Sequence, residues 1–279
     1  KIVLPMLLAH FYGDAGRSFS KIKKHKEAIR YREKAITYFH KLDNNYKILI
    51  ADNRSLIGFS YWDLKKYNKA IENKINAIKL YQELGDSSQV ATEYKMISIL
   101  YGLDLGNKEK GIKYKTKAIK LFIELNDSTE IAKEAKYAGE IFIELGDFKS
   151  AAYYLDLSIS YEKEVKDYSK LVETMGALSM ACLLSGNIDK GLEIAEKASM
   201  ICQEYNLYGE FVALSLLTGL PMIMLGQPDK AINSFEKALT NIDNIDRLDL
   251  DLEALNIYKM WINIYSGIAY IFLGEKEMG

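Results

Sequence analysis

Apolar residues recur at helical spacing along almost the whole chain. Between Ser55 and Leu64 they return every three or four positions, and a polar break over residues 65–68 follows. A second apolar stripe then runs over residues 69–81. This spacing places the apolar side chains on one face of an α-helix. The pattern therefore predicts two amphipathic helices joined by a short turn.

The same turn chemistry returns after each predicted helix. Gly85 suits the left-handed position that ends one helix, and Asp86 suits the cap that begins the next. We expect turns within helix pairs at residues 105–107, 145–147, 185–187, 225–227 and 273–275, and turns between pairs at 84–86, 125–127 and 165–167. The chain is thus predicted to be well over 70% helical, with about fourteen helices and no sheet.

A small residue opens the second helix of a pair six times, at successive spacings of 42, 41, 40, 40 and 40 residues. These residues are Ala28, Ala70, Gly111, Ala151, Gly191 and Ala231. Self-similarity at a fixed period is the signature of stacked repeats. We therefore predict an all-α, right-handed superhelical solenoid of antiparallel helix pairs, forming a single domain over residues 1–279. Its units span about 6–43, 47–86, 88–127, 128–167, 168–207 and 208–245, with a partial unit at 250–279.

Glycines recur twelve residues before the opening small residue, at Gly16, Gly58, Gly139 and Gly219, with Gly267 in the matching place of the partial unit. A glycine inside a helix costs about 1 kcal/mol relative to alanine. Its recurrence predicts a close crossing of the two helices of a pair. We expect Gly58, Gly139 and Gly219 to face the small residues Ala77, Ser158 and Ala238, respectively.

These positions resemble the tetratricopeptide repeat (TPR) family over essentially the whole chain. The best matches are Gly58/Tyr61/Ala70/Ala77, Gly139/Phe142/Gly146/Ala151 and Gly267/Tyr270/Gly274. The family's usual unit has about 34 residues, so the longer units here add about a turn to each helix. The proline common at the end of a unit is absent. Such long units resemble those of bacterial peptide-pheromone receptors, kinesin light chains and the sensor arms of large signalling ATPases and histidine kinases.

Charge and composition exclude some functions. Lys and Arg total 37 against 38 Asp and Glu, so the chain lacks the basic excess of a dedicated nucleic-acid binder. No apolar run reaches the roughly 18–20 residues of a membrane span. Cys182 and Cys202 have no ligand cluster nearby, and we expect two reduced, packed thiols. We expect a cytoplasmic location.

The two ends of the chain carry two further expectations. Residues 1–9 resemble the apolar part of a signal peptide, but Pro5 suits the start of a helix. We expect the first repeat helix there instead of a targeting segment. A chain that begins without Met and stops at Gly279 is interpreted as a piece of a longer protein. The apolar positions in residues 255–273 then predict a homodimer through this end, or disorder at the last turn.

Catalytic signatures are absent from the sequence. There is no glycine-rich phosphate loop, metalloprotease helix motif or nucleophile elbow. His10, His25 and His40 are too widely spaced for a metal site, and we expect them on the surface. Glu140 and Glu144 could act as paired acids, but a solvated groove face is the simpler interpretation. We expect no catalytic residue, no metal and no cofactor, so the chain is not predicted to be an enzyme.

The resemblance to the TPR family places peptide ligands on the inner wall, which the first helix of each unit lines. The repeat phase projects the following residues onto that wall: His10, Arg17, Ser20, Asp52, Ser55, Phe59, Trp62, Glu93, Met96, Leu100, Leu103, Lys133, Lys136, Glu140, Ile143, Met180, Leu183, Leu216, Leu220, Ile223, Trp261, Ile264 and Ile268. The wall runs from polar and mixed to apolar, and its apolar end is either a binding surface or a face that other chain covers. The predicted contacts with a ligand are Phe59, Trp62, Met96, Lys133, Lys136 and Glu140.

One activity of the family is improbable here. The clamp for the acidic tail of heat-shock chaperones uses Lys and Asn on first helices, where this chain has Ser55, Phe59, Met96 and Leu100. We predict a non-catalytic protein- or peptide-binding scaffold, the sensing or docking segment of a larger, bacterial signalling protein. The alternatives are the regulatory arm of an enzyme (kinase, protease or cyclase) and a structural oligomerisation module.

Overall fold

The computed structural model describes residues 3–42, 46–161, 167–245 and 252–274. These residues form thirteen α-helices and one short π-helical segment, are 87% helical and contain no strand. In chain order the elements are α1 Val3–Lys21, α2 His25–Phe39, α3 Lys47–Asp63, α4 Tyr67–Glu83, α5 Ser87–Ile99, η2 Leu100–Asp104, α6 Lys108–Glu124, α7 Ser128–Glu144, α8 Phe148–Tyr161, α9 Tyr168–Leu184, α10 Ile188–Glu204, α11 Tyr208–Met224, α12 Pro228–Ile245 and α13 Leu252–Phe272. The predicted all-α class is confirmed.

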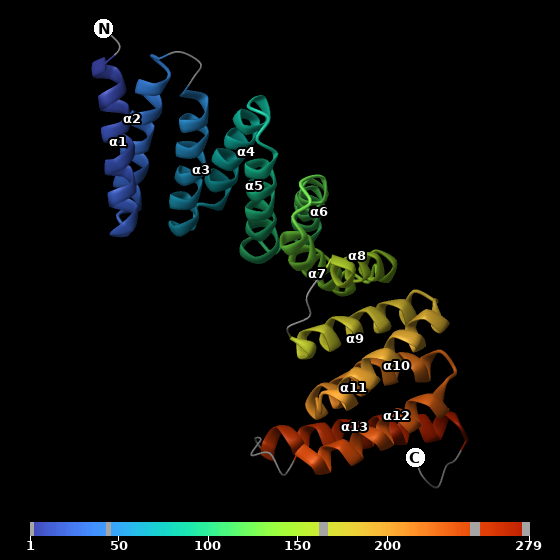
Figure 1. The fold of residues 1–279 in the computed structure, drawn as a ribbon. Coiled ribbons are helices and arrows are strands. Elements are labelled where there is room, and N and C mark those ends of the chain that lie inside the picture. The colour runs from blue at the N-terminus through green and yellow to red at the C-terminus, as the bar shows by residue number, and fades with distance from the viewer. Residues whose placement is uncertain (1–2, 43–45, 162–166, 246–251, 275–279) are drawn as a thin grey trace. The chain divides into compact units, whose positions relative to one another are not determined.

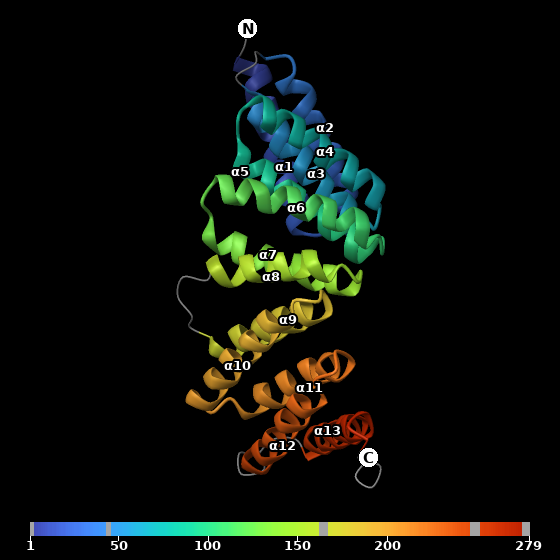
Figure 2. The same cartoon turned by 90° about the vertical axis from the view of Figure 1, so that its right-hand side faces the viewer.

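The chain divides into two compact parts, each made of several repeats, which we call unit 1 (Lys1–Glu130) and unit 2 (Ile131–Gly279). Within unit 1 each helix packs against its neighbours in the chain, α1 on α2, α2 on α3, and so on to α6 (Figure 1). Within unit 2 the same holds from α8 to α13, and α9 also packs against α11 (Figure 2). Both units are therefore TPR-like stacks of paired helices.

The predicted glycine turns adopt the left-handed conformation. Gly85, Gly106, Gly146, Gly186, Gly226 and Gly274 have φ between +64° and +88°. The side chains of Asp86 and Asn107 accept hydrogen bonds from the backbone N–H groups of Gln89 and Lys110, at 3.1 and 2.9 Å, and so cap the following helices. Residues 165 and 166 of one predicted turn lie outside the described residues.

Lysine occupies the left-handed position at two turns, Lys23 (φ +58°) and Lys65 (φ +56°). At the end of α3 the backbone N–H of Lys65 donates to the carbonyl of Trp62 at 2.7 Å, and that of Lys66 donates to Tyr61 at 2.8 Å. This pair of bonds is a Schellman motif, which glycine usually completes. The turn geometry is conserved along the chain even where glycine is not used.

Glycines do mark close contacts within helix pairs. A Cβ atom on Gly58 would lie 3.2 Å from the carbonyl oxygen of Ala70, and one on Gly139 would lie 3.3 Å from that of Ala151. The predicted partners were wrong, however. The side chains nearest to Gly58, Gly139 and Gly219 are Lys74, Leu155 and Phe235, not Ala77, Ser158 and Ala238.

The antiparallel geometry explains this difference. Residues at equal distances from the turn meet across a pair, and Gly58 lies seven residues before the turn residue Lys65. Ala77 lies twelve residues after Lys65, more than a helical turn too far along α4. Ala77 is buried nevertheless, with the core residues of unit 1.

The π-helical segment η2 shifts the pattern in the third pair. A Cβ atom added to Gly111, in the first turn of α6, would lie 3.0 Å from the backbone nitrogen of Gly102 and 3.0 Å from the carbonyl oxygen of Ser98. The position that holds glycine in four other pairs is therefore occupied here by the buried Ser98, which lies thirteen residues before Gly111 and not twelve. A π-helical turn accommodates one extra residue, which also accounts for the spacing of 41 at this step.

Five residues projected onto the inner wall are buried instead, namely the polar Ser55 and Glu93 and the apolar Leu100, Leu183 and Ile223. Leu100, Leu183 and Ile223 are almost completely buried and pack within apolar clusters. Leu183, for example, lies against the backbone at Gly191, where an added Cβ would be 2.7 Å from its Cγ. The first helix of a pair is covered on two sides, by the second helix of its own pair and by the next pair. Its solvent-exposed face is therefore narrower than the repeat phase alone predicts.

Two smaller expectations can also be compared with the structure. Cys182 and Cys202 are free, buried thiols, as predicted. His10 and His40 are exposed, but His25 is not: its Nδ1 is buried and lies 3.3 Å from a carboxylate oxygen of Asp63. No helix within the described ranges is long and apolar enough to cross a membrane.

Candidate functional site

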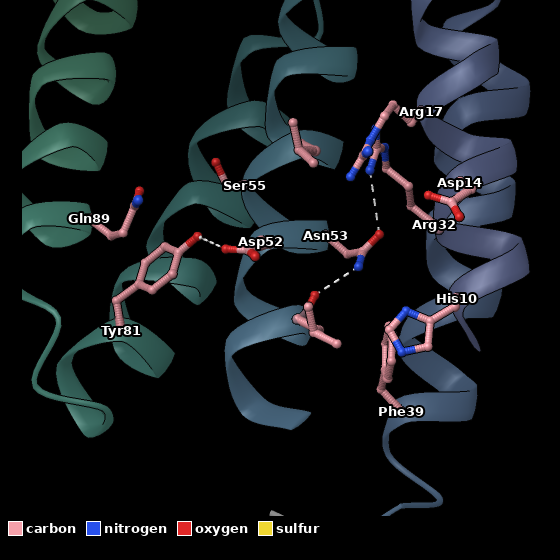
Figure 3. Close-up of a pocket in the computed structure, with 13 residues that line it drawn as sticks. His10, Asp14, Arg17, Arg32, Phe39, Asp52, Asn53, Ser55, Tyr81 and Gln89 are labelled. Carbon is pink, nitrogen blue, oxygen red and sulfur yellow. Dashed lines mark hydrogen bonds between the residues drawn. The ribbon is translucent and has the colours of Figure 1, made fainter. Parts of the chain in front are cut away.

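Unit 1 holds a pocket of about 290 Å³ on the side of its first helices (Figure 3). Most of the lining comes from α1 and α3, with two residues from α2 and one each from α4 and α5. The lining residues are His10, Gly13, Asp14, Arg17, Arg32, Phe39, Leu49, Asp52, Asn53, Ser55, Leu56, Tyr81 and Gln89. Four of them, His10, Arg17, Asp52 and Ser55, are residues that the repeat phase projects onto the inner wall.

Arg32 is the deepest charged group of this pocket. Its side chain rises from α2 and is only 3% exposed. Gly16 makes the space, because an added Cβ there would lie 2.6 Å from Cγ of Arg32. One guanidinium nitrogen, Nη1, is 3.5 Å from Oδ1 of Asn53, while the buried Nε has no hydrogen-bond partner.

The pKa of Arg32 reflects this environment. Burial, followed by repulsion from Arg17, lowers it from 12.5 to about 10. Figure 3 shows the guanidinium groups of Arg17 and Arg32 next to each other on the α1 side, with Asn53 opposite. Two like charges held together without a carboxylate between them favour an added anion.

The opposite wall of the pocket is polar and internally bonded. The hydroxyl of Tyr81 donates to Oδ1 of Asp52 at 2.7 Å, and the amide nitrogen of Asn53 donates to the carbonyl of Leu49 at 2.7 Å. Burial and the bond to Asp52 raise the pKa of Tyr81, so its hydroxyl stays protonated. These bonds hold Asp52 and Asn53 in place on α3.

A buried ion pair lies beside the pocket, between α4 and α5. Nζ of Lys74 is 2.9 Å from Oε2 of Glu93, and both side chains are almost fully buried. Ser55 donates to the other oxygen of Glu93 at 2.5 Å. Burial lowers the pKa of Lys74, and the charge of Glu93 opposes that effect.

The predicted contact Phe59 covers this ion pair. The ammonium of Lys74 lies 3.7 Å from the centre of the Phe59 ring, which is a cation–π contact. Phe59 also stacks on Trp62, with ring centres 6.2 Å apart. Phe59 is 36% exposed, whereas Trp62 and Met96 are half-buried. All three belong to unit 1, but none lines the pocket.

The other three predicted contacts belong to unit 2. Lys133 is exposed, and Lys136 and Glu140 are half-buried, all on α7. Lys136 forms an ion pair of 2.9 Å with Glu173 on α9, which joins two successive first helices. The structure therefore brings Lys136 to a first-helix face but already gives it a carboxylate partner.

Sequence reasoning missed Arg32 because it searched the first helices alone. The signal was present in the repeat: Arg32, Lys74 and Lys115 occupy the same position of three successive second helices, and all three are buried. In unit 2 the same position holds Leu155, Ala195 and Phe235. A basic residue that recurs on an otherwise buried face is unusual, since charged side chains are rarely buried without a partner.

The described residues include no group of three or more His, Cys, Asp or Glu side chains that could hold a metal ion.

Comparison with solved structures supports the fold. The chain is similar to the apo form of RapI, with a TM-score of 0.52 and 17% identity over 97% of this chain and 99% of that one. It is also similar to the signal transduction ATPase with a tetratricopeptide repeat sensor from Pyrococcus horikoshii, with a TM-score of 0.56 and 15% identity over 92% of this chain and 39% of that one. A third similar structure is aspartyl phosphate phosphatase F from Bacillus subtilis, with a TM-score of 0.51 and 20% identity over 84% and 59% of the two chains.

No family model and no curated protein matches the chain by sequence. Identities of this size establish the fold alone. The chain is accordingly a TPR-like helical repeat protein, and its function has to be argued from its own residues.

Proposed function

We propose that this chain is a non-catalytic scaffold that binds a protein or peptide, and that it serves as the sensing or docking segment of a larger signalling protein. The observation that carries the proposal is the pocket of unit 1, where consecutive first helices offer charged and polar groups beside the apolar side chains of Phe39, Leu49 and Leu56. Recognition sites combine a few oriented polar groups with apolar contact area in this way. The repeats of the Pyrococcus horikoshii ATPase are that protein's sensor, and we extend this role to the present chain.

In unit 2 the proposed contacts are Lys133, Lys136 and Glu140, alongside Phe59, Trp62 and Met96 in unit 1. An acidic ligand would compete with Glu173 for Lys136, since the pair at 2.9 Å is partly open to solvent. Partly exposed pairs contribute little to stability, about 0–1 kcal/mol, so exchange of one carboxylate for another is inexpensive.

A peptide-display selection against the intact chain tests the proposal. Binders are then measured by fluorescence anisotropy with Lys136→Glu and with the control Lys190→Glu. The control is matched, because Lys190 forms a 3.0 Å pair with Asp156 that joins the second helices α8 and α10. An acidic or mixed-charge peptide is expected to lose affinity with Lys136→Glu, most strongly at low salt, and to be unaffected by Lys190→Glu. A selection that yields no binder, or binders sensitive only to Lys190→Glu, contradicts the proposed scaffold face.

The apolar face of α13 supports a second role, pairing with another copy of the chain. Ile257, Trp261, Ile264 and Ile271 are between 43% and 59% exposed, and three of them recur every seven residues. A stripe with this period suits packing against an identical helix across a two-fold axis. Light scattering tests this: Ile264→Glu is expected to halve the mass of a dimer, and a monomeric parent would contradict the proposal.

Two further parts of the proposal concern location and catalysis. The buried free thiols Cys182 and Cys202 suit a reducing compartment, so we place the chain in the cytoplasm. Burial raises the pKa of Cys202 to about 12, which makes it a poor nucleophile. Together with a formal net charge of −1, this favours a binding protein over an enzyme or a nucleic-acid binder. If the chain is instead an enzyme's regulatory arm, ligand binding should alter the activity of an attached catalytic domain.

A further inference from the structure

Two helix pairs of unit 1, α1/α2 and α3/α4, each bury a cation at the same repeat position, but only the second supplies a carboxylate partner for it. Arg32 and Lys74 each lie four residues after the opening alanine of a second helix, and each lies over a glycine of the preceding helix. Opposite Lys74, the next first helix supplies Glu93 at 2.9 Å. Opposite Arg32, the corresponding residue of α3 is Asn53, which is neutral.

The correspondence between Asn53 and Glu93 follows from the repeat. Asn53 lies seventeen residues before Ala70, and Glu93 lies eighteen before Gly111. The extra residue is the one that the π-helical segment η2 adds to the third pair. Asn53 therefore stands where a carboxylate would complete the charge pairing.

Arg32 thus lacks the counter-charge that its equivalent in the next pair has. A buried charge without a partner is costly, and a protein that keeps one at the wall of an open pocket leaves a place for an external partner. From these contacts we infer that the pocket binds a carboxylate group of a peptide, which forms a charge-assisted pair with Arg32 and with the exposed Arg17. This inference rests on the proposed peptide-binding function and specifies its ligand chemistry.

The remaining lining residues select among anions. Asp14 and Asp52 also face the pocket, so a phosphate with nearly two negative charges would be repelled more than a carboxylate with one. Phe39, Leu49 and Leu56 supply apolar surface for the part of the ligand next to the carboxylate. A volume of about 290 Å³ admits one or two amino-acid residues. The carboxylate has two possible sources, the C-terminus of a peptide or an acidic side chain.

The first experiment follows the arginine Nε–H signals of the intact chain by NMR. The Arg32 signal is assigned by its loss in Arg32→Met, and the parent is titrated with sodium acetate, acetamide and inorganic phosphate. Acetate is expected to shift the Arg32 signal in a saturable way, while acetamide leaves it unchanged. A shift with phosphate alone, or no shift with acetate, overturns the inference.

Three small peptides then separate the two sources of the carboxylate. N-acetyl-glycylglycine carries only a terminal carboxylate, and its amide carries none. The third peptide, N-acetyl-aspartic acid α-amide, carries only a side-chain carboxylate. Binding of either acid with no binding of the neutral amide supports the inference and identifies the source. Equal binding of the neutral amide contradicts it.

Variants test whether Arg32 carries the binding. Arg32→Met is expected to weaken carboxylate binding by about tenfold or more, because a hydrogen bond to a charged group contributes about 1.5–3 kcal/mol. Arg54→Met is the matched control: Arg54 lies on α3 of the same unit but bonds Asn73 at 3.3 Å, outside the pocket lining. Asp14→Asn is expected to tighten binding, because it removes a repelling charge. Equal binding by Arg32→Met and the parent overturns the inference.

Stability gives a readout that does not depend on any ligand. Because Arg32 has no carboxylate partner, Arg32→Met is expected to raise the melting temperature of the free chain, whereas Arg54→Met is not. A melting temperature that falls sharply would show that Arg32 is already compensated within the chain. Failure of these tests leaves the peptide-display experiment unaffected, so the broader proposal and this inference can fail separately.

Discussion

A missing side chain decides how closely the helices of a pair approach. At Gly16, Gly58 and Gly139 the backbone carbonyl of the partner helix lies 3.2 or 3.3 Å from the place where a Cβ would be. At Ser179, the corresponding position of a later pair, the hydroxyl itself donates to the carbonyl of Gly191 at 2.7 Å. A small residue is therefore required at this position, either to make room or to form a hydrogen bond to the same carbonyl.

Gly139→Ala is expected to destabilise the chain. The added Cβ would lie 2.5 Å from Cγ of Leu155, and overpacking of this kind costs about 1–3 kcal/mol. That loss exceeds the roughly 1 kcal/mol that alanine gains over glycine in a helix. Urea unfolding with Gly13→Ala as control tests this, because nothing lies within 4 Å of a Cβ on Gly13. The control should be stabilised, and a shift of both variants in the same direction would contradict the assigned contact.

Lys65→Gly is expected to stabilise the chain by about 1 kcal/mol. Lys65 has φ of +56°, a conformation that costs a residue with a side chain about 1–2 kcal/mol. The turns after the later first helices place glycine at this point, for example Gly106. Thermal unfolding measures the change. Lys66→Gly should bring no gain, since Lys66 has φ of −94°.

At the scale of helices, one recurring position lies where one pair stacks on the next. In unit 1 that position holds a buried cation, and where its partner is a carboxylate the two form an ion pair, as Lys74 and Glu93 do. Such a pair contributes little net stability, because the cost of removing both charges from water offsets their attraction. Removal of only one of the two charged side chains is much more costly, because the other charge stays buried without its partner.

Lys74→Met is expected to destabilise the chain by about 3–5 kcal/mol, because Glu93 would remain buried with only Ser55 as partner. The double variant Lys74→Met/Glu93→Met should regain most of that loss, since apolar side chains of similar volume replace the pair. A double-mutant cycle by chemical denaturation measures the coupling. Additive single effects would show that the two charges do not interact in solution.

The helix pairs and their turns could be predicted from sequence, because their signals are local. Gly85 and Gly106 indicate the turns that they form. The six small residues that open the second helices give the repeat period. The burial of Arg32 could not be predicted in the same way. It depends on the absence of a side chain at Gly16, sixteen positions before Arg32, and on the neutral side chain of Asn53, twenty-one positions after it. It also depends on where the helices cross.

The predicted wall residues failed for a related reason. Helical phase indicates which face of a helix a residue occupies, but not how much of that face the next pair covers. Leu183 is one of the projected wall residues and is nevertheless fully buried. The assignment of Phe59, Trp62, Met96, Lys133, Lys136 and Glu140 as ligand contacts stays a prediction.

At the scale of the whole chain, the two units are built on different interiors. The recurring second-helix position is charged in unit 1, at Arg32, Lys74 and Lys115, and apolar in unit 2, at Leu155 and Phe235. The clusters of unit 2 are correspondingly rich in large apolar side chains. Burial of apolar area stabilises a fold more than burial of paired charges does.

We therefore expect backbone amides in α9–α12 to exchange with solvent more slowly than those in α2–α5. Native-state hydrogen exchange measures this, because repeat arrays open locally. The variant Lys74→Met/Glu93→Met, which gives unit 1 an apolar joint, should slow exchange in α4 and α5 alone. Faster exchange in unit 2 than in unit 1 would contradict the expectation.

The residues opposite the buried cations also limit how such an array can grow. If α3 and α4 were duplicated in tandem, Lys74 would meet the asparagine of the copied α3 in place of Glu93, and a second unpaired charge would be buried. Duplication of α9 and α10 would bring Ala195 against the copied helix and would isolate no charge. We therefore expect lengthening by gene duplication to cost less stability at α9 and α10 than at α3 and α4.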